Sequence, residues 1–181
     1  MKNLFSNSKS ILALLALVFV GLSSCKKLSI KADFNSADVV FTVNQQTTAG
    51  VYDHIQTFSY NLDSIATANN IDLAQIKSVT LKEAIVMIED PLQPSVTFDM
   101  VNDANLVIGA PGMTDVTIAS KNPVPTGGLT SIPIDVNTSV NLLDYTKANT
   151  TTIHVTGSTN TPLPHNVPMR VKIKYTIEGE L

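Results

Sequence analysis

The 181-residue sequence has no tryptophan, only one cysteine and few charged residues. A single cysteine cannot form an internal disulfide, and it excludes metal or redox sites that need several cysteines. The formal charge of −3 argues against a nucleic-acid partner, because such a surface needs basic groups to neutralise phosphates. A charged fraction of 15% beside 44% hydrophobic residues argues against wholesale disorder. This length and composition fit one ordinary globular domain.

The N-terminal segment has the pattern of a secretory signal peptide. Residues 1–24 contain Lys2 and Lys9, no acidic residue, and an apolar run from Ile11 to Leu22. This run is shorter than the roughly 20 apolar residues that a membrane-spanning helix requires. We therefore predict that residues 1–24 are a cleaved signal and not a permanent membrane span.

The apolar run ends in Leu22-Ser23-Ser24-Cys25, which places an aliphatic and two small residues before the only cysteine. This tetrapeptide resembles the lipobox of bacterial lipoproteins. The chain as a whole is similar in style to the small single-domain outer-membrane lipoproteins of Bacteroidota-type bacteria. The resemblance implies cleavage between Ser24 and Cys25, and lipidation of Cys25 as the first mature residue. The alternative is a plain secreted protein with a leftover cysteine.

The resemblance also implies membrane lipid as a partner of the mature chain. Two lipid chains on the Cys25 sulfur, and usually a third on its amine, would hold the protein stably at a membrane. Removing residues 1–24 leaves 157 residues and changes the formal charge from −3 to −5. Residues 25–28 then form a short tether, and Lys26, Lys27 and Lys31 near the lipid either meet anionic headgroups or are merely solvated.

The residues after Cys25 favour one destination in the cell envelope. In lipoproteins of Gram-negative bacteria, an aspartate after the cysteine tends to retain the protein at the inner membrane, and this chain has Lys26 there. Surface-exposed lipoproteins of Bacteroidota-type bacteria often carry an acidic cluster at this point, and residues 26–30 have none. By resemblance, we expect an outer-membrane anchor with the domain facing the periplasm.

From residue 29 onward, apolar and polar residues alternate with period two, which is typical of strands with one buried face. The clearest case is the apolar face formed by Val171, Ile173, Tyr175 and Ile177. Further strands are expected in the ranges 29–34, 38–43, 54–60, 79–89, 95–101, 106–109, 116–118, 131–136 and 153–155. We predict that residues 29–181 form one all-β domain, a two-sheet antiparallel β-sandwich of about nine strands in Greek-key or jelly-roll order.

Two short segments interrupt the strand pattern and predict one or two connecting helices. Residues 62–68 have apolar residues at helical spacing after Asn61, a candidate N-cap. Residues 140–145 follow Ser139 and predict one or two helical turns. The proline-rich stretches 122–128 and 161–168 predict loops, and the second is long enough to link the two sheets.

A hairpin is predicted around Pro91 and Pro94, which forbid continued strand pairing. Pairing residue 90 with residue 95 places four apolar residues on one core face: Ile85, Met87, Phe98 and Met100. The opposite face mixes apolar and polar groups, and a second layer or loop is expected to cover part of it. We take this face as a candidate partner surface, formed by Val86, Ile88 and Asp99. Glu89 and Asp90 are interpreted as a charged hairpin end that blocks edge pairing.

Candidates for chemistry are few. His54 follows Asp53, but neighbours on a strand point to opposite faces, so we interpret His54 as a solvated strand residue. His154 is assigned to the polar face of its strand and His165 to a loop. Asp99 and Asp103 lie near asparagines and offer the oxygen ligands that Ca²⁺ prefers, but their spacing fits a polar turn better than an EF-hand loop. We expect no catalytic residue, no metal and no cofactor.

Aromatic residues give little sign of a sugar-binding platform. Trp is absent, and Tyr and Phe number only four and six. Tyr52, Tyr60 and Tyr145 are interpreted as half-buried side chains with their hydroxyls in water. Sugar binding is therefore unsupported by the sequence.

The sequence predicts a location and a class of protein, but no specific activity. The first hypothesis is a lipid-anchored, non-enzymatic β-sandwich at the periplasmic face of the outer membrane, either structural or binding an envelope protein or small ligand. The alternative is a surface-exposed adhesin or assembly subunit that adds a partner strand at an exposed edge. A hydrolase is the least favoured, and a pocket with two carboxylates, or with a histidine and a carboxylate, would favour it.

Overall fold

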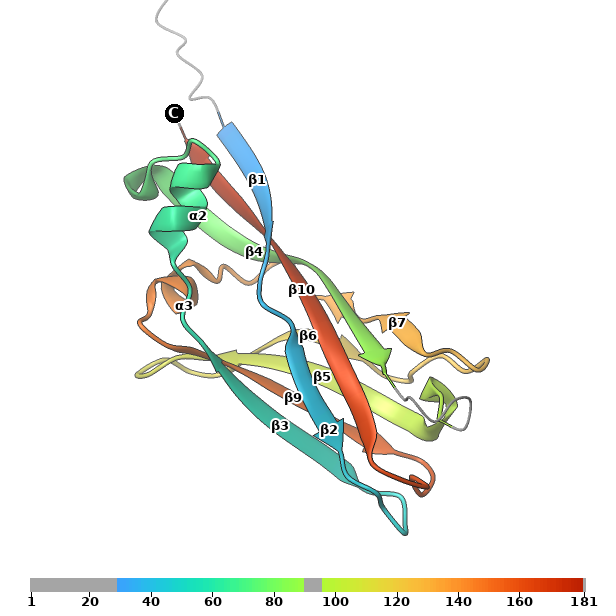
Figure 1. The fold of residues 1–181 in the computed structure, drawn as a ribbon. Helices are drawn as coiled ribbons and strands as arrows, with labels where there is room; N and C mark the ends of the chain where they lie inside the picture. Colours follow the sequence, from blue (N-terminus) through green and yellow to red (C-terminus); the bar gives the residue numbers. More distant parts are fainter. Residues whose placement is uncertain (1–28, 90–95, 181) are drawn as a thin grey trace, which may run out of the picture.

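A computed structural model describes residues 29–89 and 96–180 of the chain. The predicted signal peptide, the lipobox with Cys25, the tether and Asp90 lie outside these residues. Two five-stranded antiparallel sheets face each other (Figure 1), which confirms the predicted two-sheet β-sandwich. Among the described residues, no helix has the length and apolar character to cross a bilayer.

The first sheet, called here the β10 sheet, is built around the longest strand. It contains β1 (Ser29–Asn35), β2 (Val39–Val43), β4 (Ile76–Ile88), β7 (Ser131–Pro133) and β10 (Val167–Glu180). The second, called the β9 sheet, contains β3 (Val51–Phe58), β5 (Val101–Gly109), β6 (Val116–Lys121), β8 (Asp135–Val136) and β9 (Thr151–Thr159).

The chain wraps between the sheets in pairs of strands. β2 and β3 pair with β10 and β9, and β4 and β5 pair with the other sides of the same two strands. β6 and β7 then pair with β5 and β4, while β1 and β8 are added at sheet edges. The connections β2–β3, β4–β5, β6–β7 and β9–β10 all cross from one sheet to the other. This is the jelly-roll order, one of the two orders that the sequence predicted.

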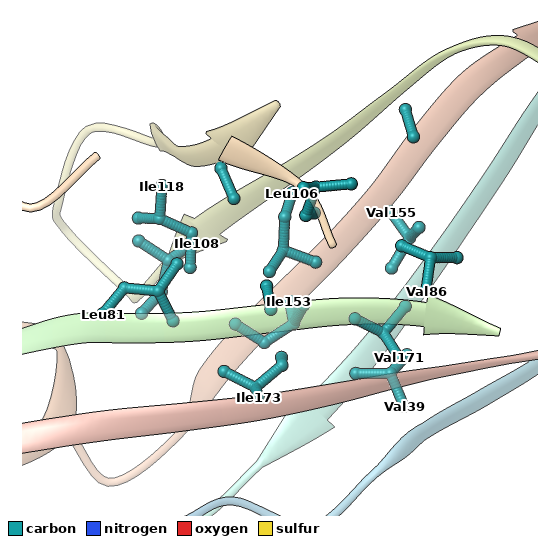
Figure 2. Packing of buried hydrophobic residues seen from close by; sticks show 14 of the residues in the cluster. Val39, Leu81, Val86, Leu106, Ile108, Ile118, Ile153, Val155, Val171 and Ile173 are labelled. Atoms are coloured by element: carbon teal, nitrogen blue, oxygen red, sulfur yellow. The ribbon is translucent and has the colours of Figure 1, made fainter. Parts of the chain in front are cut away.

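The core lies between the two sheets because alternate residues of each strand point inward. In β10 the predicted apolar face is buried, and the intervening residues lie on the outer face. Figure 2 shows side chains from both sheets meeting in this layer, among them Leu106 and Ile153 from the β9 sheet and Leu81 and Val171 from the β10 sheet. Burying a side chain of this size contributes roughly 1.5–3 kcal/mol to stability.

The predicted hairpin around residues 90–95 is wrong. β4 pairs with β10 and β7, whereas β5 begins at Val101 in the other sheet. Residues 98–100 form a short 3-10 helix, η2 (Phe98–Met100). The chain therefore crosses the sandwich here instead of folding back along β4. A proline-containing loop is compatible with a hairpin and with a crossing to the other sheet, so the local sequence did not distinguish the two.

Because the chain crosses to the other sheet here, most of the predicted partner surface is wrong. Val86 and Ile88 are only 2% and 6% exposed and belong to the core, while Ile85 and Met87 lie half-buried on the outer face. Both alternate sets in this stretch of β4 are apolar, so the pattern alone did not fix which set points inward. Asp99 is exposed and lies in η2, away from Val86 and Ile88 along the chain.

Short helices lie in the connections, as predicted. α2 (Leu62–Ala68) has Asn61 as its N-cap, whose side-chain oxygen accepts a hydrogen bond from the Ser64 N–H at 2.9 Å. η1 (Leu73–Gln75) leads into β4. α3 (Leu143–Lys147) begins at Leu143, later than the predicted start after Ser139. Residues 160–166 link β9 to β10 across the sandwich, which confirms that predicted loop.

Asn141 explains why α3 starts where it does. Its side-chain oxygen accepts hydrogen bonds from the backbone N–H groups of Leu143 and Val79, both at 3.1 Å. Its amide nitrogen donates to the carbonyl of Lys77 at 3.1 Å. One side chain thus binds the start of the helix, whose N-cap is Leu142, and ties it to β4, a role that sequence spacing did not reveal.

Candidate functional site

The outer face of the β10 sheet carries most of the charged side chains that the structure pairs. Lys31 binds Glu178 at 3.2 Å, and Lys77 lies 3.8 Å from Glu180. Lys82 binds Asp33, whose carboxylate also accepts a hydrogen bond from the Thr176 hydroxyl at 2.7 Å. The hydrogen bond from Lys82 is the largest cause of the lowered pKa of Asp33.

Arg170 is the centre of a charged network on the same face. Its Nε and Nη2 donate to the two oxygens of Glu89 at 2.6 and 3.1 Å, and its Nη1 donates to Asp38 at 2.7 Å. These bonds hold the pKa of Glu89 below, and that of Arg170 above, their ordinary values. The predicted role of Glu89 as the end of a hairpin is therefore wrong. Glu89 and Asp38 instead join β4 and the start of β2 to β10.

Two bulges flank β10 at the same level. On one side, residues 36–38 stand opposite only Lys172 and Ile173, between the paired residues Asn35–Lys174 and Val39–Val171. On the other side, the register of β4 shifts between Lys174 and Tyr175. Bulges bend a strand and re-aim its side chains, and they occur preferentially next to functional sites.

A cavity of about 320 Å³ lies between these bulges on the outer face of the sheet. We call it the β10 cavity. Its lining residues are Asn35, Asp38, Glu83, Ile85, Lys172, Ile173 and Lys174. Ile173 points into the core, so its backbone contributes to the lining, whereas Ile85 offers an apolar side chain on the outer face. The cavity is therefore a small hollow with both polar and apolar walls.

Three of the four charged groups of the β10 cavity differ from their neighbours in making no direct ion pair among the described residues. Within residues 29–89 and 96–180, the side chains of Lys172, Lys174 and Glu83 make no ion pair, and Asp38 is held by Arg170. The other charged side chains of this face do form ion pairs: Lys31 with Glu178, Lys82 with Asp33, and Arg170 with Glu89 and Asp38. Lys77 pairs with Glu180 at the longer distance of 3.8 Å. The cavity thus has two ammonium groups and one carboxylate that form no direct ion pair among the described residues. The charges of Lys174 and Lys172 do help to lower the pKa of Asp33 and Glu89, respectively.

The outer face of the β9 sheet holds two separate carboxylate contacts. His154 Nε2 contacts the carboxylate of Asp53, and the Ser158 hydroxyl donates to Asp103. His154 and Ser158 are four residues apart on β9, which corresponds to roughly 13 Å, so they do not form one catalytic triad. The His154–Asp53 contact was missed because it depends on the β3–β9 register, which no local pattern encodes.

The candidate Ca²⁺ ligands are not brought together. Asp99 accepts hydrogen bonds from the N–H groups of Gly127 and Gly128, at 2.7 and 3.2 Å from Oδ1. Asp103 lies in β5 and binds Ser158 and, at 3.2 Å, Asn105. In the part of the chain that the structure describes, no group of three or more His, Cys, Asp or Glu side chains is arranged to hold a metal ion. Asp99 instead holds the turn at Gly127 and Gly128, and Asp103 lies in a strand, so the predicted polar turn that joins the two aspartates is wrong.

Several single-residue predictions need correction. His54 is not solvated: its ring stacks on Phe41 with centroids 5.1 Å apart, and its Nε2 is buried without a hydrogen-bond partner. Tyr52 is buried, and its hydroxyl donates to the Asp103 carbonyl at 3.1 Å instead of facing water. Burial raises the pKa of Tyr52 well above its ordinary value. Asp53 and His54 do point to opposite faces, as predicted.

The edge of the β9 sheet at β3 offers a second candidate surface. Thr159 N–H donates to the Gly50 carbonyl at 2.8 Å, in register with the β3–β9 pairing. Because bonded and non-bonded pairs alternate in an antiparallel ladder, Asp53, Ile55 and Thr57 direct their backbone groups away from β9. Val51 and Ile55 are 74% and 59% exposed on this strand. β3 contains no Lys or Pro and no register shift, which are usual devices that protect an edge, and its exposed charged residue, Asp53, contacts His154 of β9.

Comparison with known proteins gives no functional assignment. No protein family and no curated protein matches the chain. Two solved structures of Turnip yellow mosaic virus are similar to it, each with a TM-score of 0.28, at 14% and 15% sequence identity. The matches cover 86% of this chain and 96% of the viral chains. A TM-score this low carries no argument about what the chain does.

Proposed function

We propose that the chain is a lipid-anchored, non-enzymatic module of the bacterial outer membrane that faces the periplasm and binds a small ligand or an envelope partner. The observation that supports it most is the position of the lipobox relative to the fold. Ser29, where β1 begins, follows Cys25 by only four residues and pairs with Glu180 of β10. Four extended residues span at most about 14 Å, so an acylated Cys25 would hold the sandwich against the bilayer.

The short tether also suggests an orientation for the domain. The start of β1, the end of β10 and α2 lie at one end of the sandwich (Figure 1), and the β2–β3 and β9–β10 connections lie at the other. Anchoring through Cys25 would turn the first end toward the membrane. The β10 cavity lies on the side of the sandwich, so it would stay open to the periplasm.

Metabolic labelling with a clickable fatty acid tests the anchor. We expect label on the wild-type protein and on Ser29→Ala, a control substitution just past the tether. The Cys25→Ala variant should carry no label because the thiol that accepts the lipid is gone. An unlabelled wild type, or equal label on Cys25→Ala, contradicts the proposal.

The β3 edge supports a second candidate function, that of a surface-exposed adhesin or assembly subunit. Outward backbone groups at Ile55 and Thr57, beside the exposed Val51 side chain, suit a partner that adds an extended strand. The hydrolase alternative stays a prediction. The β10 cavity holds the carboxylates of Asp38 and Glu83, but Asp38 is bound to Arg170, and no histidine is among its lining residues.

A further inference from the structure

We propose that the β10 cavity binds a small organic carboxylate that carries a hydroxyl or ammonium group next to its carboxylate. This inference rests on the proposed role as a binding module but does not depend on the lipid anchor. It follows from three observations: which charged groups of the cavity make no direct ion pair among the described residues, where these groups lie in the strand register, and how large the cavity is.

The two lysines define the anionic end of the ligand. Lys172 and Lys174 lie two residues apart on the outer face of β10, a separation of about 7 Å along the strand. Neither makes an ion pair within the described part of the chain, although the lysines at positions 31, 77 and 82 on the same face all do. A carboxylate placed between the two ammonium groups would receive charge-assisted hydrogen bonds from both.

The register places hydrogen-bond acceptors beside the same lysines. Glu83 and Asn35 are the paired residues of Lys174 on its two sides, in β4 and β1. Their oxygens accept hydrogen bonds, so they suit a hydroxyl or ammonium group of the ligand. The charged residues that line the cavity, Asp38, Glu83, Lys172 and Lys174, comprise two charges of each sign, so the cavity suits a ligand that presents both a carboxylate and a hydrogen-bond donor.

The apolar wall and the volume limit the rest of the ligand. Ile85 is paired with Lys172 and is half-buried on the outer face, so it can contact an aliphatic ring or chain. A cavity of about 320 Å³ lies at the lower end of ligand sites, which run to roughly 300–1,000 Å³. A single sugar acid or a single amino acid fits this description, and both share the same carboxylate chemistry.

Calorimetric titration of the full-length protein in detergent tests the proposal and distinguishes a sugar acid from an amino acid as the ligand. The probes are glucuronate and glutamate, with glucose as a control that lacks the carboxylate and acetate as a control that lacks the second group. We expect saturable binding of at least one acid and of neither control. Glu83→Gln should weaken glutamate more than glucuronate, because only glutamate presents an ammonium group to that carboxylate.

Matched variants establish where the acid binds. Lys172→Gln and Lys174→Gln should each weaken binding at least about tenfold, a loss of ~1.4 kcal/mol. Lys31→Gln removes the same charge from the same face outside the cavity, and it should leave binding unchanged. All three side chains are on the outer face, so each variant should keep the wild-type circular dichroism spectrum.

The result that overturns the proposal is well defined. It fails if neither acid binds, if glucose or acetate binds as well as the acids, or if Lys31→Gln weakens binding as much as the cavity variants. Cys25→Ala protein should still bind the acid. A wild-type protein that carries no fatty-acid label but binds the acid would contradict the anchor alone. A labelled wild-type protein that binds neither acid would contradict the ligand site alone.

Discussion

Gly157 of β9 is paired with Tyr52 of β3, and the phenol ring lies where a side chain at position 157 would be. A Cβ at this position would lie 2.2 Å from both the Tyr52 hydroxyl and the backbone oxygen of Asp103. The backbone oxygen belongs to β5 in the middle of the sheet, so it cannot move away cheaply. The glycine therefore permits the buried Tyr52–Asp103 hydrogen bond that joins three strands.

We predict that Gly157→Ala destabilises the protein by about 2 kcal/mol or more, because overpacking a filled site forces backbone shifts. Thr156→Ala is the matched control, since Thr156 lies on the outer face of the same strand, and its effect should stay within about 0.5 kcal/mol. Urea denaturation of both variants measures the difference. Equal midpoints for Gly157→Ala and wild type would show that the ring and backbone relax without cost.

Arg170 shows how one side chain links strands that are distant in sequence. It bonds to Glu89 at the end of β4 and to Asp38 at the start of β2, so ionised carboxylates favour the folded state. The lowered pKa of Glu89 means that this contribution is present above the ordinary value of 4.5 and is lost as the pH falls through the folded-state pKa. In Arg170→Gln, NMR titration should find the Glu89 pKa raised toward 4.5, whereas Lys77→Gln should leave it lowered. An unchanged Glu89 pKa in Arg170→Gln would rule out the arginine as the cause.

At the scale of elements, α2 is a short helix whose formation depends on its first turn. Seven residues are too few for a stable isolated helix, so packing of Leu62 and Ala66 and the Asn61 cap hold it in place. Its polar N-cap and apolar spacing are local features, which explains why both were predicted correctly. α3 was predicted to start too early because Asn141, which precedes its N-cap Leu142, is hydrogen-bonded to β4.

We predict that Asn61→Ala destabilises the protein by about 1 kcal/mol, because the Ser64 N–H loses its acceptor. Asn61→Asp keeps a side-chain oxygen at the cap and should remain near wild type. Hydrogen exchange of the α2 amides, compared with those of β9, measures the local effect. If Asn61→Asp exchanges as fast as Asn61→Ala, the capping bond is not what stabilises the turn.

At the scale of the whole molecule, β3 is the terminal strand of the β9 sheet, and its outer side leaves room for strand addition. If the chain is an assembly subunit, Ile55→Lys should reduce the size of the native complex on a membrane gel, because a charge on an edge opposes pairing. Thr117→Lys, on an exposed position of β6, is the control and should not change the size. A wild-type protein that migrates as a single chain, and that resists protease added to intact cells, contradicts this second function.

The fold and the candidate site differ in how much of them the sequence predicted. The β10 face of Val171, Ile173, Tyr175 and Ile177 was predicted because its neighbours are polar, so only one set of residues can be buried. In β4, the sequence did not predict which alternate residues point inward, because Ile85 and Met87 are as apolar as Val86 and Ile88. The β10 cavity escaped prediction as well, since its residues come from β1, the start of β2, β4 and β10, and are assembled by pairing and by two bulges.

The sequence by itself determined the all-β class and the positions of most strands and of α2, and it predicts a lipid anchor at Cys25. These are local signals, set by side chains within a few residues of one another. Only the tertiary structure decided that β4 leads across the sandwich, that His154 contacts Asp53, and that Lys172, Lys174 and Glu83 share one cavity. These depend on contacts between strands far apart in the chain, where many pairings satisfy the same local pattern and packing of the whole core selects one.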